Sequence, residues 1–471
     1  MASKAIQAAR LLSRRSHVLP DQLLVSELFF EVPQDYKNLS RGTLQLFGRT
    51  VTKHEKPIVP LSDAEAKKAD QKPWLVYLEG GPGFGNREPQ DSPITRMALN
   101  RGYQVLFLDY RGTGLSTPVS AAMLATKGSP ADQAAYLRLL RADNIVRDCE
   151  AVRHVLTDDY PEEKKRWSLL GQSFGGFVSL SYLSLYPQGL REVFMTGGLA
   201  PVGKTAEQVY SALFKRVIQR NQSYYQKFPE DVQNVRQIAR HIQEKGGAIV
   251  LPAGGELTVP RLLTLGIGFG FHGGLDAVHS LILRAKTDLD QLGFLDRPVL
   301  SALERDNPLD TNIIYAILHE PIYNFKPGVR SGWAAHSVGK SLAQYSWLAD
   351  PAALSAASDE PLFFTGEMIF PFHFDTYPEL IPLKAAAEEL AAYDDWPELY
   401  DEEQLRRNEV PVFAASYTHD MYVDADLARE TAALVRGCKV YETNVMYHNA
   451  LRARTNDVLG ELFKLRDGEI D

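Results

Sequence analysis

Short apolar segments that alternate with helix-like segments constrain the fold of this chain most. In the first part of the chain these expected strands are Val25–Val32, Leu44–Val51, Trp74–Leu78, Tyr103–Leu108, Trp167–Leu170 and Val193–Thr196. The segment Asn144–Leu156 lies among them and has apolar residues at helical spacing. Apolar strands without polar alternation that are separated by helices indicate a parallel sheet with both faces buried.

The same pattern returns near the C-terminus after a middle section of a different kind. From about Val202 onward helix-like segments dominate and strand signals are scarce. Strand, helix, strand and helix patterns then follow at Pro411–Tyr417, Asp426–Val435, Lys439–Thr443 and Asn456–Leu465. We therefore expect one α/β domain that is interrupted by a large, mainly helical insertion.

This pattern divides the chain into four parts. We expect the first part of the α/β domain over 21–201, the insertion over 202–404 and the second part over 405–471. Residues 1–20 contain basic side chains and no acid, and we expect a basic tail there. An acid-poor start that contains Arg and Ser is also typical of a mitochondrial presequence. We expect a cytoplasmic protein, with a mitochondrial location as the alternative.

Composition excludes several classes of protein. Lys and Arg total 51 and Asp and Glu total 59, a net charge of −8, which disfavours non-specific nucleic-acid binding. The only cysteines, Cys149 and Cys438, exclude a disulfide framework and favour a reducing compartment. No apolar run of about 18 residues occurs, so we expect no membrane span.

The strongest local motif is G-x-S-x-G at residues 171–175, with Ser173 at its centre. It follows an expected strand and opens an expected helix, which is the context of a nucleophile elbow. In that sharp turn the serine hydroxyl stands clear of its neighbours, and the helix N-terminus favours developing negative charge. A plain turn between strand and helix is the alternative, and the placement favours a nucleophile.

A serine nucleophile needs a base and an acid that orients the base. In this architecture the chain order is Ser, then Asp or Glu, then His. Asp420 and His448 each follow an expected C-terminal strand, at the sheet edge where ligands bind. Asp424 is the rival acid but lies farther into the following helix, and His419 is the rival base.

A second glycine cluster, at residues 80–83, directly follows the strand Trp74–Leu78. Acyl transfer requires backbone N–H groups aimed at the oxyanion. We expect one from Phe174, the residue after the nucleophile, and one from Gly81, because glycine allows close backbone approach. An ordinary Gly-Pro turn is the alternative.

In these motifs the chain resembles the prolyl aminopeptidase family of α/β-hydrolase serine peptidases, in its longer-cap form. The matching features are the GGPG loop at 80–83, the segment DYRGTGLS at 109–116, the elbow at 171–176, and the late Asp and His. The resemblance implies an α/β-hydrolase fold whose helical insertion is a cap placed before the catalytic Asp. Two positions depart from the family: Glu79 stands where His is usual, and Phe174 where Trp is frequent.

The resemblance also implies a site for the free α-amino group of a substrate, made by two glutamates of the cap. Glu320, after an aromatic-rich helix, and Glu367, in the segment FFTGEMIF, match them. A buried carboxylate pair is costly unless a cation neutralises it, which independently favours an amine ligand. The alternative is that both glutamates are solvated.

We therefore expect a serine exopeptidase that releases the N-terminal residue, preferentially proline, from peptides with a free N-terminus. The alternatives are an esterase or small-amide hydrolase with the same triad, and a non-catalytic scaffold of the same fold. No metal or organic cofactor is expected, since the sequence contains neither H-E-x-x-H nor C-x-x-C. The sequence makes no prediction of oligomeric state.

Overall fold

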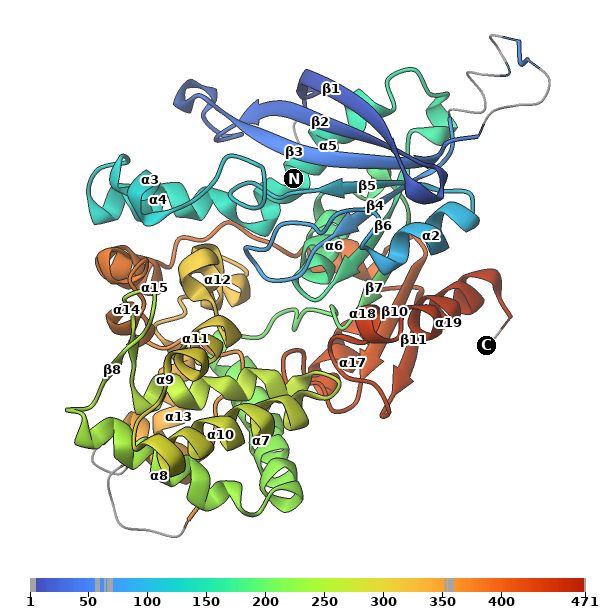
Figure 1. Ribbon diagram of the computed structural model, residues 1–471. Coiled ribbons are helices and arrows are strands. Elements are labelled where there is room, and N and C mark those ends of the chain that lie inside the picture. Colours follow the sequence, from blue (N-terminus) through green and yellow to red (C-terminus); the bar gives the residue numbers. More distant parts are fainter. Residues whose placement is uncertain are drawn as a thin grey trace.

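A nine-stranded sheet forms the centre of the molecule (Figure 1). The computed structural model describes residues 6–55, 60–62, 65, 71–350, 354 and 360–469. The sheet order is β1-β2-β3-β5-β4-β6-β7-β10-β11. Its strands are β1 Arg10–Leu19, β2 Leu23–Pro33, β3 Thr43–Lys53, β4 Trp74–Leu78, β5 Gln104–Leu108, β6 Trp167–Gln172, β7 Leu190–Thr196, β10 Val412–Tyr417 and β11 Cys438–Thr443.

Every pairing from β5 to β11 is parallel, whereas β1, β2, β3 and β5 pair antiparallel in succession. The expected mostly parallel sheet is confirmed. The parallel strands β4, β5, β6 and β10 are buried along their whole length because helices cover both faces. Along β5, for example, Val105 and Phe107 contribute to one core cluster, and Leu106 and Leu108 to another.

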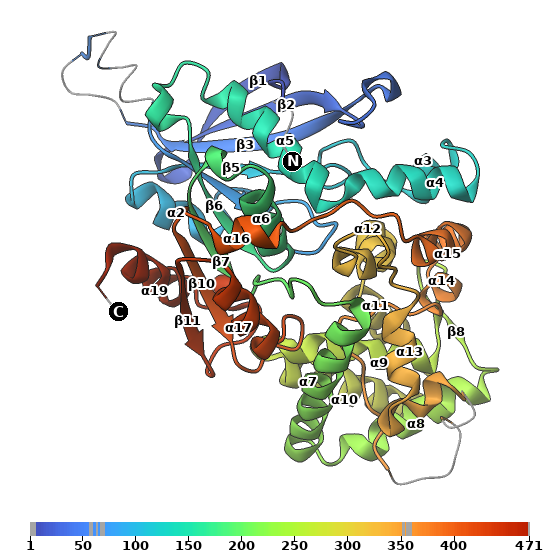
Figure 2. The same ribbon diagram turned by 180° about the vertical axis from the view of Figure 1, so that it is seen from behind.

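Different helices cover the two faces. The helices α2 (Pro93–Asn100) and α19 (Thr455–Asp467) pack in the core that contains Val105 and Phe107. The opposite face is covered by helices that face the viewer in Figure 2. They are α5 Ala142–Leu156, α6 Phe174–Leu185, α16 Glu402–Arg406 and α17 Ala425–Leu434.

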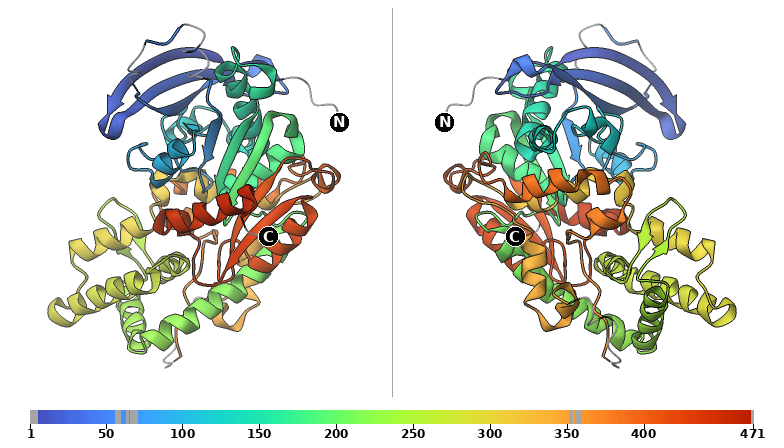
Figure 3. Two further views of the ribbon diagram at one scale, coloured as in Figure 1. Left: turned by 90° about the vertical axis from the view of Figure 1, so that its right-hand side faces the viewer. Right: turned by 90° about the vertical axis from the view of Figure 1, so that its left-hand side faces the viewer.

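The chain between β7 and β10 is mainly helical, as the sequence predicts. It carries α7 Ala206–Lys227, α8 Asp231–Glu244, α9 Val259–Leu263, α10 Gly274–Leu292, α11 Arg297–Asp306, α12 Ile313–Leu318, α13 Ala334–Lys340, α14 His373–Thr376 and α15 Lys384–Ala392, with a hairpin of β8 (Ile249–Val250) and β9 (Glu256–Leu257). Most of it lies at the end of the molecule opposite β1–β3 (Figure 3). α12 and α15 share a core cluster with α4 (Pro130–Leu137) and with α3 (Ala121–Ala125).

The expected tail over residues 1–20 is wrong for Arg10–Leu19, which form β1. This strand pairs antiparallel with β2 along its length, and Arg10 Nη2 lies 2.7 Å from Glu31 Oε1. A tight connection allows the hairpin, because Asp21 and Gln22 both adopt positive φ. Composition could not reveal this, since β1 is held by backbone pairing at the sheet edge while most of its side chains are exposed. In the described part of the chain, no helix is long and apolar enough to cross a membrane.

Candidate active site

Ser173 occupies a strained turn between β6 and α6. Its φ of 55° and ψ of −122° lie in a region that non-glycine residues rarely adopt. The turn requires small neighbours: a Cβ on Gly175 would lie 2.0 Å from the backbone oxygen of Leu78. The local geometry is that of a nucleophile elbow, with the hydroxyl exposed above the N-terminus of α6.

The structure brings Ser173, His448 and Asp420 together from three separate parts of the chain. His448 Nε2 lies 2.9 Å from Ser173 Oγ, and His448 Nδ1 lies 2.7 Å from Asp420 Oδ2. The other oxygen of Asp420 accepts hydrogen bonds from the backbone N–H groups of Tyr422 (2.8 Å) and Val423 (3.1 Å). These contacts fix the carboxylate, which in turn orients the imidazole.

Burial and charge act in opposite directions on His448. Burial lowers the pKa of its imidazole, the charge and the hydrogen bond of the Asp420 carboxylate raise that pKa, and the net shift is upward. Glu367 raises the pKa further and Arg452 lowers it. Asp420 and Glu367 therefore stabilise the protonated imidazole, which is the form that a general base takes when it accepts a proton.

Asp424 and His419, the alternative acid and base, have other positions. Asp424 accepts the N–H groups of Asp426 and Leu427 as the N-cap of α17, and pairs with Arg216 at 3.0 Å. His419 is exposed to solvent. Among the described residues, no hydrogen bond joins Asp424 or His419 to Ser173 or His448.

The backbone N–H groups of Gly81 and Phe174 flank the elbow. Phe174 is the first residue of α6, where a helix leaves its N–H groups unpaired. Gly81 has φ of 126°, and a Cβ there would lie 2.8 Å from the nitrogen of Gly83. Over the described residues neither N–H group has an acceptor in the protein. Both are thus available to an oxyanion.

The segment at 109–116 supports the glycine loop and does not line the cavity. One carboxylate oxygen of Asp109 accepts the backbone N–H (2.7 Å) and side-chain N–H (3.1 Å) of Asn86. The other accepts the N–H of Leu115 at 2.9 Å. Burial raises the pKa of Asp109, while these N–H groups lower it. Asp109 therefore holds the end of the loop that begins at Gly80.

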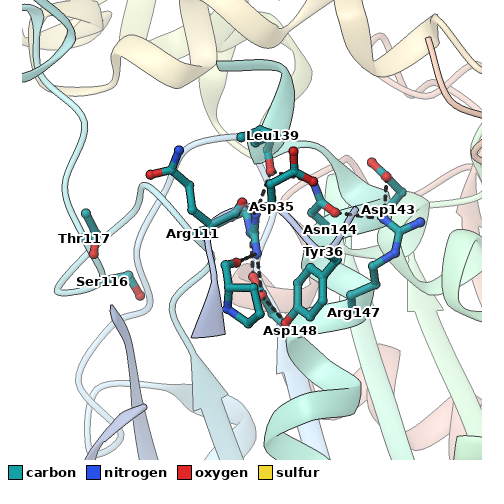
Figure 4. Close-up of polar contacts among 12 residues, drawn as sticks. Asp35, Tyr36, Arg111, Ser116, Thr117, Leu139, Asp143, Asn144, Arg147 and Asp148 are labelled. Carbon is teal, nitrogen blue, oxygen red and sulfur yellow. Dashed lines mark hydrogen bonds and ion pairs between the residues drawn. The ribbon is translucent and has the colours of Figure 1, made fainter. Parts of the chain in front are cut away.

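Arg111 from the same segment is fully buried and ties three parts of the fold together (Figure 4). Its Nε and Nη2 donate to Asp148 of α5 at 2.7 and 2.6 Å. Its Nη1 donates to the backbone oxygens of Gln34 (3.0 Å) and Leu139 (2.9 Å). Tyr36 adds a hydrogen bond to Asp148 at 2.8 Å. The arginine of this motif is thus structural.

A cavity of about 390 Å³ opens over Ser173, a size typical of small-ligand sites. Ser173, His448 and Gly81 line it on the side of the sheet, and Tyr315 and Glu367 line it on the side of the insertion. The insertion therefore closes over the end of the sheet that carries the three-residue cluster.

The two expected amine-binding glutamates differ in position. Glu367 lines the cavity, is 8% exposed, and lies 3.6 Å from the Nε2 of His319. Glu320 is buried but does not line the cavity, and it accepts the N–H groups of Ala334 (3.2 Å) and Ala335 (2.9 Å) at the start of α13. Burial raises the pKa of Glu320 to about 7, although these N–H groups lower it.

Sequence reasoning missed Arg452 and Tyr422, which also line the cavity. Arg452 pairs with Glu79, and the departure from the family at position 79 was the only signal for it. A metal has one possible site among the described residues, Glu230, Asp231 and His279. It lies on the insertion outside the cavity, and Asp231 there already accepts hydrogen bonds from His279 and Asn234.

The mostly parallel sheet, the strained turn at Ser173 and the cluster of Ser173, His448 and Asp420 are together the architecture of an α/β hydrolase. The family model of the alpha/beta hydrolase fold matches residues 73–240. A proline iminopeptidase of Aspergillus aculeatus is 40% identical over 99% of this chain and 99% of its own length. One from Aeromonas sobria is 40% identical over 95% of this chain and 98% of its own. The chain belongs to the proline iminopeptidase family of α/β hydrolases.

A crystal structure of a proline iminopeptidase from Mycobacterium smegmatis aligns over 97% of this chain and 98% of that chain. Its TM-score is 0.40 and its sequence identity 13%, which is too distant to bear on the function.

Proposed function

We propose that this protein is a prolyl aminopeptidase, a serine exopeptidase that releases N-terminal proline from peptides with a free N-terminus. The observation that carries this proposal is the cavity that Ser173 and His448 line together with Glu367, a buried carboxylate that, unlike Glu79, has no Arg or Lys partner among the described residues. The curated relatives named proline iminopeptidases support the same substrate.

In the proposed mechanism, Ser173 Oγ attacks the carbonyl carbon of the first residue while His448 Nε2 takes the hydroxyl proton. The N–H groups of Gly81 and Phe174 stabilise the oxyanion of the tetrahedral intermediate. His448 then donates the proton to the departing amine, and the acyl-enzyme remains on Ser173. Water attacks this ester with His448 as base, releases proline and restores the hydroxyl. Asp420 holds the imidazole tautomer throughout.

Glu367 would bind the cationic α-amine or imine nitrogen of the substrate. An ammonium group beside this carboxylate neutralises a buried charge, which a blocked N-terminus cannot do. With the N-terminus held at Glu367, the first peptide bond would be the one presented to Ser173. We propose that Glu320 contributes negative charge only at a distance and only above its pKa of about 7, because both of its carboxylate oxygens already accept N–H groups of α13. Residues 202–404 act as the cap, and the cytoplasm remains the proposed compartment.

The test is a comparison of proline arylamide, N-acetyl-proline arylamide and para-nitrophenyl acetate as substrates. A prolyl aminopeptidase cleaves the first, with proline preferred over other residues, and leaves the acetylated compound intact. Equal cleavage of both arylamides would refute the amine site and favour an amidase. Cleavage of the acetate alone would favour an esterase. Ser173→Ala should abolish all activity while the protein stays folded.

A further inference from the structure

An ion pair beside the catalytic cluster joins two loops that the proposed mechanism needs in register. Arg452 Nη2 lies 2.7 Å from both carboxylate oxygens of Glu79. The Glu79 side chain is 4% exposed and that of Arg452 38% exposed. Both residues line the cavity. The pair is therefore a charged contact at the site itself, and no step of the proposed mechanism uses it.

On one side, Glu79 shapes the oxyanion loop. It ends the run from β4 and immediately precedes Gly80 and Gly81. Its Oε1 accepts the backbone N–H of Gly80 at 2.8 Å, and its backbone oxygen accepts the hydroxyl of Tyr110 at 3.0 Å. These bonds fix the peptide units that precede the N–H of Gly81. The side chain of Glu79 thus sets where that N–H points.

On the other side, Arg452 belongs to α18 (Ala450–Ala453), one helical turn beyond His448. The segment is held from the elbow as well, because Gln172 Nε2 donates to the backbone oxygen of His448 at 3.3 Å. The ion pair is a second and charged tie, and it runs directly from the base segment to the oxyanion loop.

We propose that Glu79 and Arg452 form a positioning pair that holds the Gly81 N–H in register with Ser173 and His448. This inference rests on the proposed oxyanion role of Gly81. The pair acts through its neighbours and neither residue needs to touch the substrate. It also explains why this chain has Glu at a position where its family usually has His: the carboxylate can bind the Gly80 N–H and an arginine at once.

The pair has an electrostatic signature as well as a geometric one. The charged groups that face His448 are Asp420, Glu367 and Arg452, and Arg452 is balanced by Glu79. Removal of the Glu79 charge leaves Arg452 unpaired, which favours neutral imidazole and moves the acid limb of the pH profile down. Removal of Arg452 leaves Glu79 unpaired and moves the limb up. These opposite shifts show that both charges act on His448, whereas the loss in kcat measures the positioning role.

The test uses Glu79→Gln, Arg452→Met and the double variant, with activity expressed per active site titrated by a fluorophosphonate. We expect each single variant to lose about 10- to 100-fold in kcat on proline arylamide and on para-nitrophenyl acetate alike, with KM within about 2-fold. The double variant should be no worse than the worse single one, because the pair acts as a unit. The acetate readout needs no amine site, so it remains valid if the proposed substrate is wrong.

Glu150→Gln is the matched control. Glu150 forms a buried pair with Arg153 at 2.7 Å within α5 and does not line the cavity, so this variant should lose stability but keep kcat. Unchanged kcat per titrated site in Glu79→Gln and the double variant, with only a lower Tm, would overturn the proposal. A rise in KM without a loss of kcat in Arg452→Met would also overturn it, because Arg452 would then bind substrate directly. Glu79→Gln keeps an acceptor for Gly80, so the test stands even if Arg452→Met fails to fold.

Discussion

Glu367→Gln is the substitution that most directly tests how the cavity selects its substrate. The carboxylate lies on the wall opposite Ser173 and is 8% exposed. Glutamine keeps the volume and one carbonyl oxygen, so the cavity shape is preserved and only the negative charge is removed. The nearest group able to carry positive charge is the imidazole of His319, at 3.6 Å.

The expected magnitude follows from the burial of this carboxylate. A hydrogen bond to a charged group contributes about 1.5–3 kcal/mol, and leaving one member of a buried ion pair without its partner costs about 3–5 kcal/mol. Because Gln retains an acceptor, we expect a loss of about 2–4 kcal/mol in transition-state binding. At about 1.4 kcal/mol for each factor of ten, kcat/KM for proline arylamide should fall about 30- to 700-fold.

The assay compares kcat/KM on proline arylamide and on para-nitrophenyl acetate for the same preparation. The acetate carries no amine, so its hydrolysis should change by less than about 2-fold, well within the effect of one weak contact. Glu388→Gln is the control. Glu388 lies on α15 outside the cavity, and it accepts the Nε1–H of Trp333 at 3.0 Å. An equal loss on both substrates, or a loss on proline arylamide of less than about 3-fold, would refute a role for Glu367 in amine binding.

Three further predictions follow from other parts of the site and its support. Asp420→Asn should lower kcat about 10³- to 10⁴-fold without unfolding the protein. It should also move the acid limb of the kcat/KM profile to lower pH, because Asp420 raises the pKa of His448. An unmoved acid limb in the pH–rate profile would contradict this. Burial raises the pKa of Glu320 from 4.5 to about 7, so the folded state binds this proton more tightly than the unfolded state does. The free energy of unfolding should therefore fall by up to about 3 kcal/mol as pH rises between these values. Urea titrations across that range should show this pH dependence in the wild type and a weaker one in Glu320→Gln. Asp148→Asn should lower the free energy of unfolding by about 3–5 kcal/mol because it leaves the buried guanidinium of Arg111 without its counter-ion, and a change below about 1 kcal/mol in urea unfolding would show that the network is dispensable.

Local patterns were sufficient for most elements of the central domain. β4 spans Trp74–Leu78 as the sequence predicts, and α5 and α6 begin within two residues of the expected positions. Strand and helix periodicities are properties of neighbouring residues, so one sequence displays them directly. The elbow at Ser173 is equally local, because the strained turn needs small residues at fixed offsets.

β1 marks the first limit of such reasoning. Its side chains are mostly exposed, and no periodicity distinguishes it from a tail. It exists because the edge of β2 offers unpaired backbone groups, and a tight turn returns the chain to them. Backbone pairing leaves no trace in composition, so this strand was decided by tertiary structure.

The site shows the same division. Two patterns were enough to select Asp420 and His448: the order of Ser, Asp and His along the chain, and their places after strand ends. Parallel strands have their C-terminal ends at the same edge of the sheet. The sequence could not separate Glu367 from Glu320, since both lie in aromatic segments of the insertion. Only packing decides that α13 captures the carboxylate of Glu320 and leaves that of Glu367 on the cavity wall. The contact of Arg452 with Glu79 likewise joins residues that are distant in sequence, and charge alone cannot specify which of many arginines meets a given glutamate.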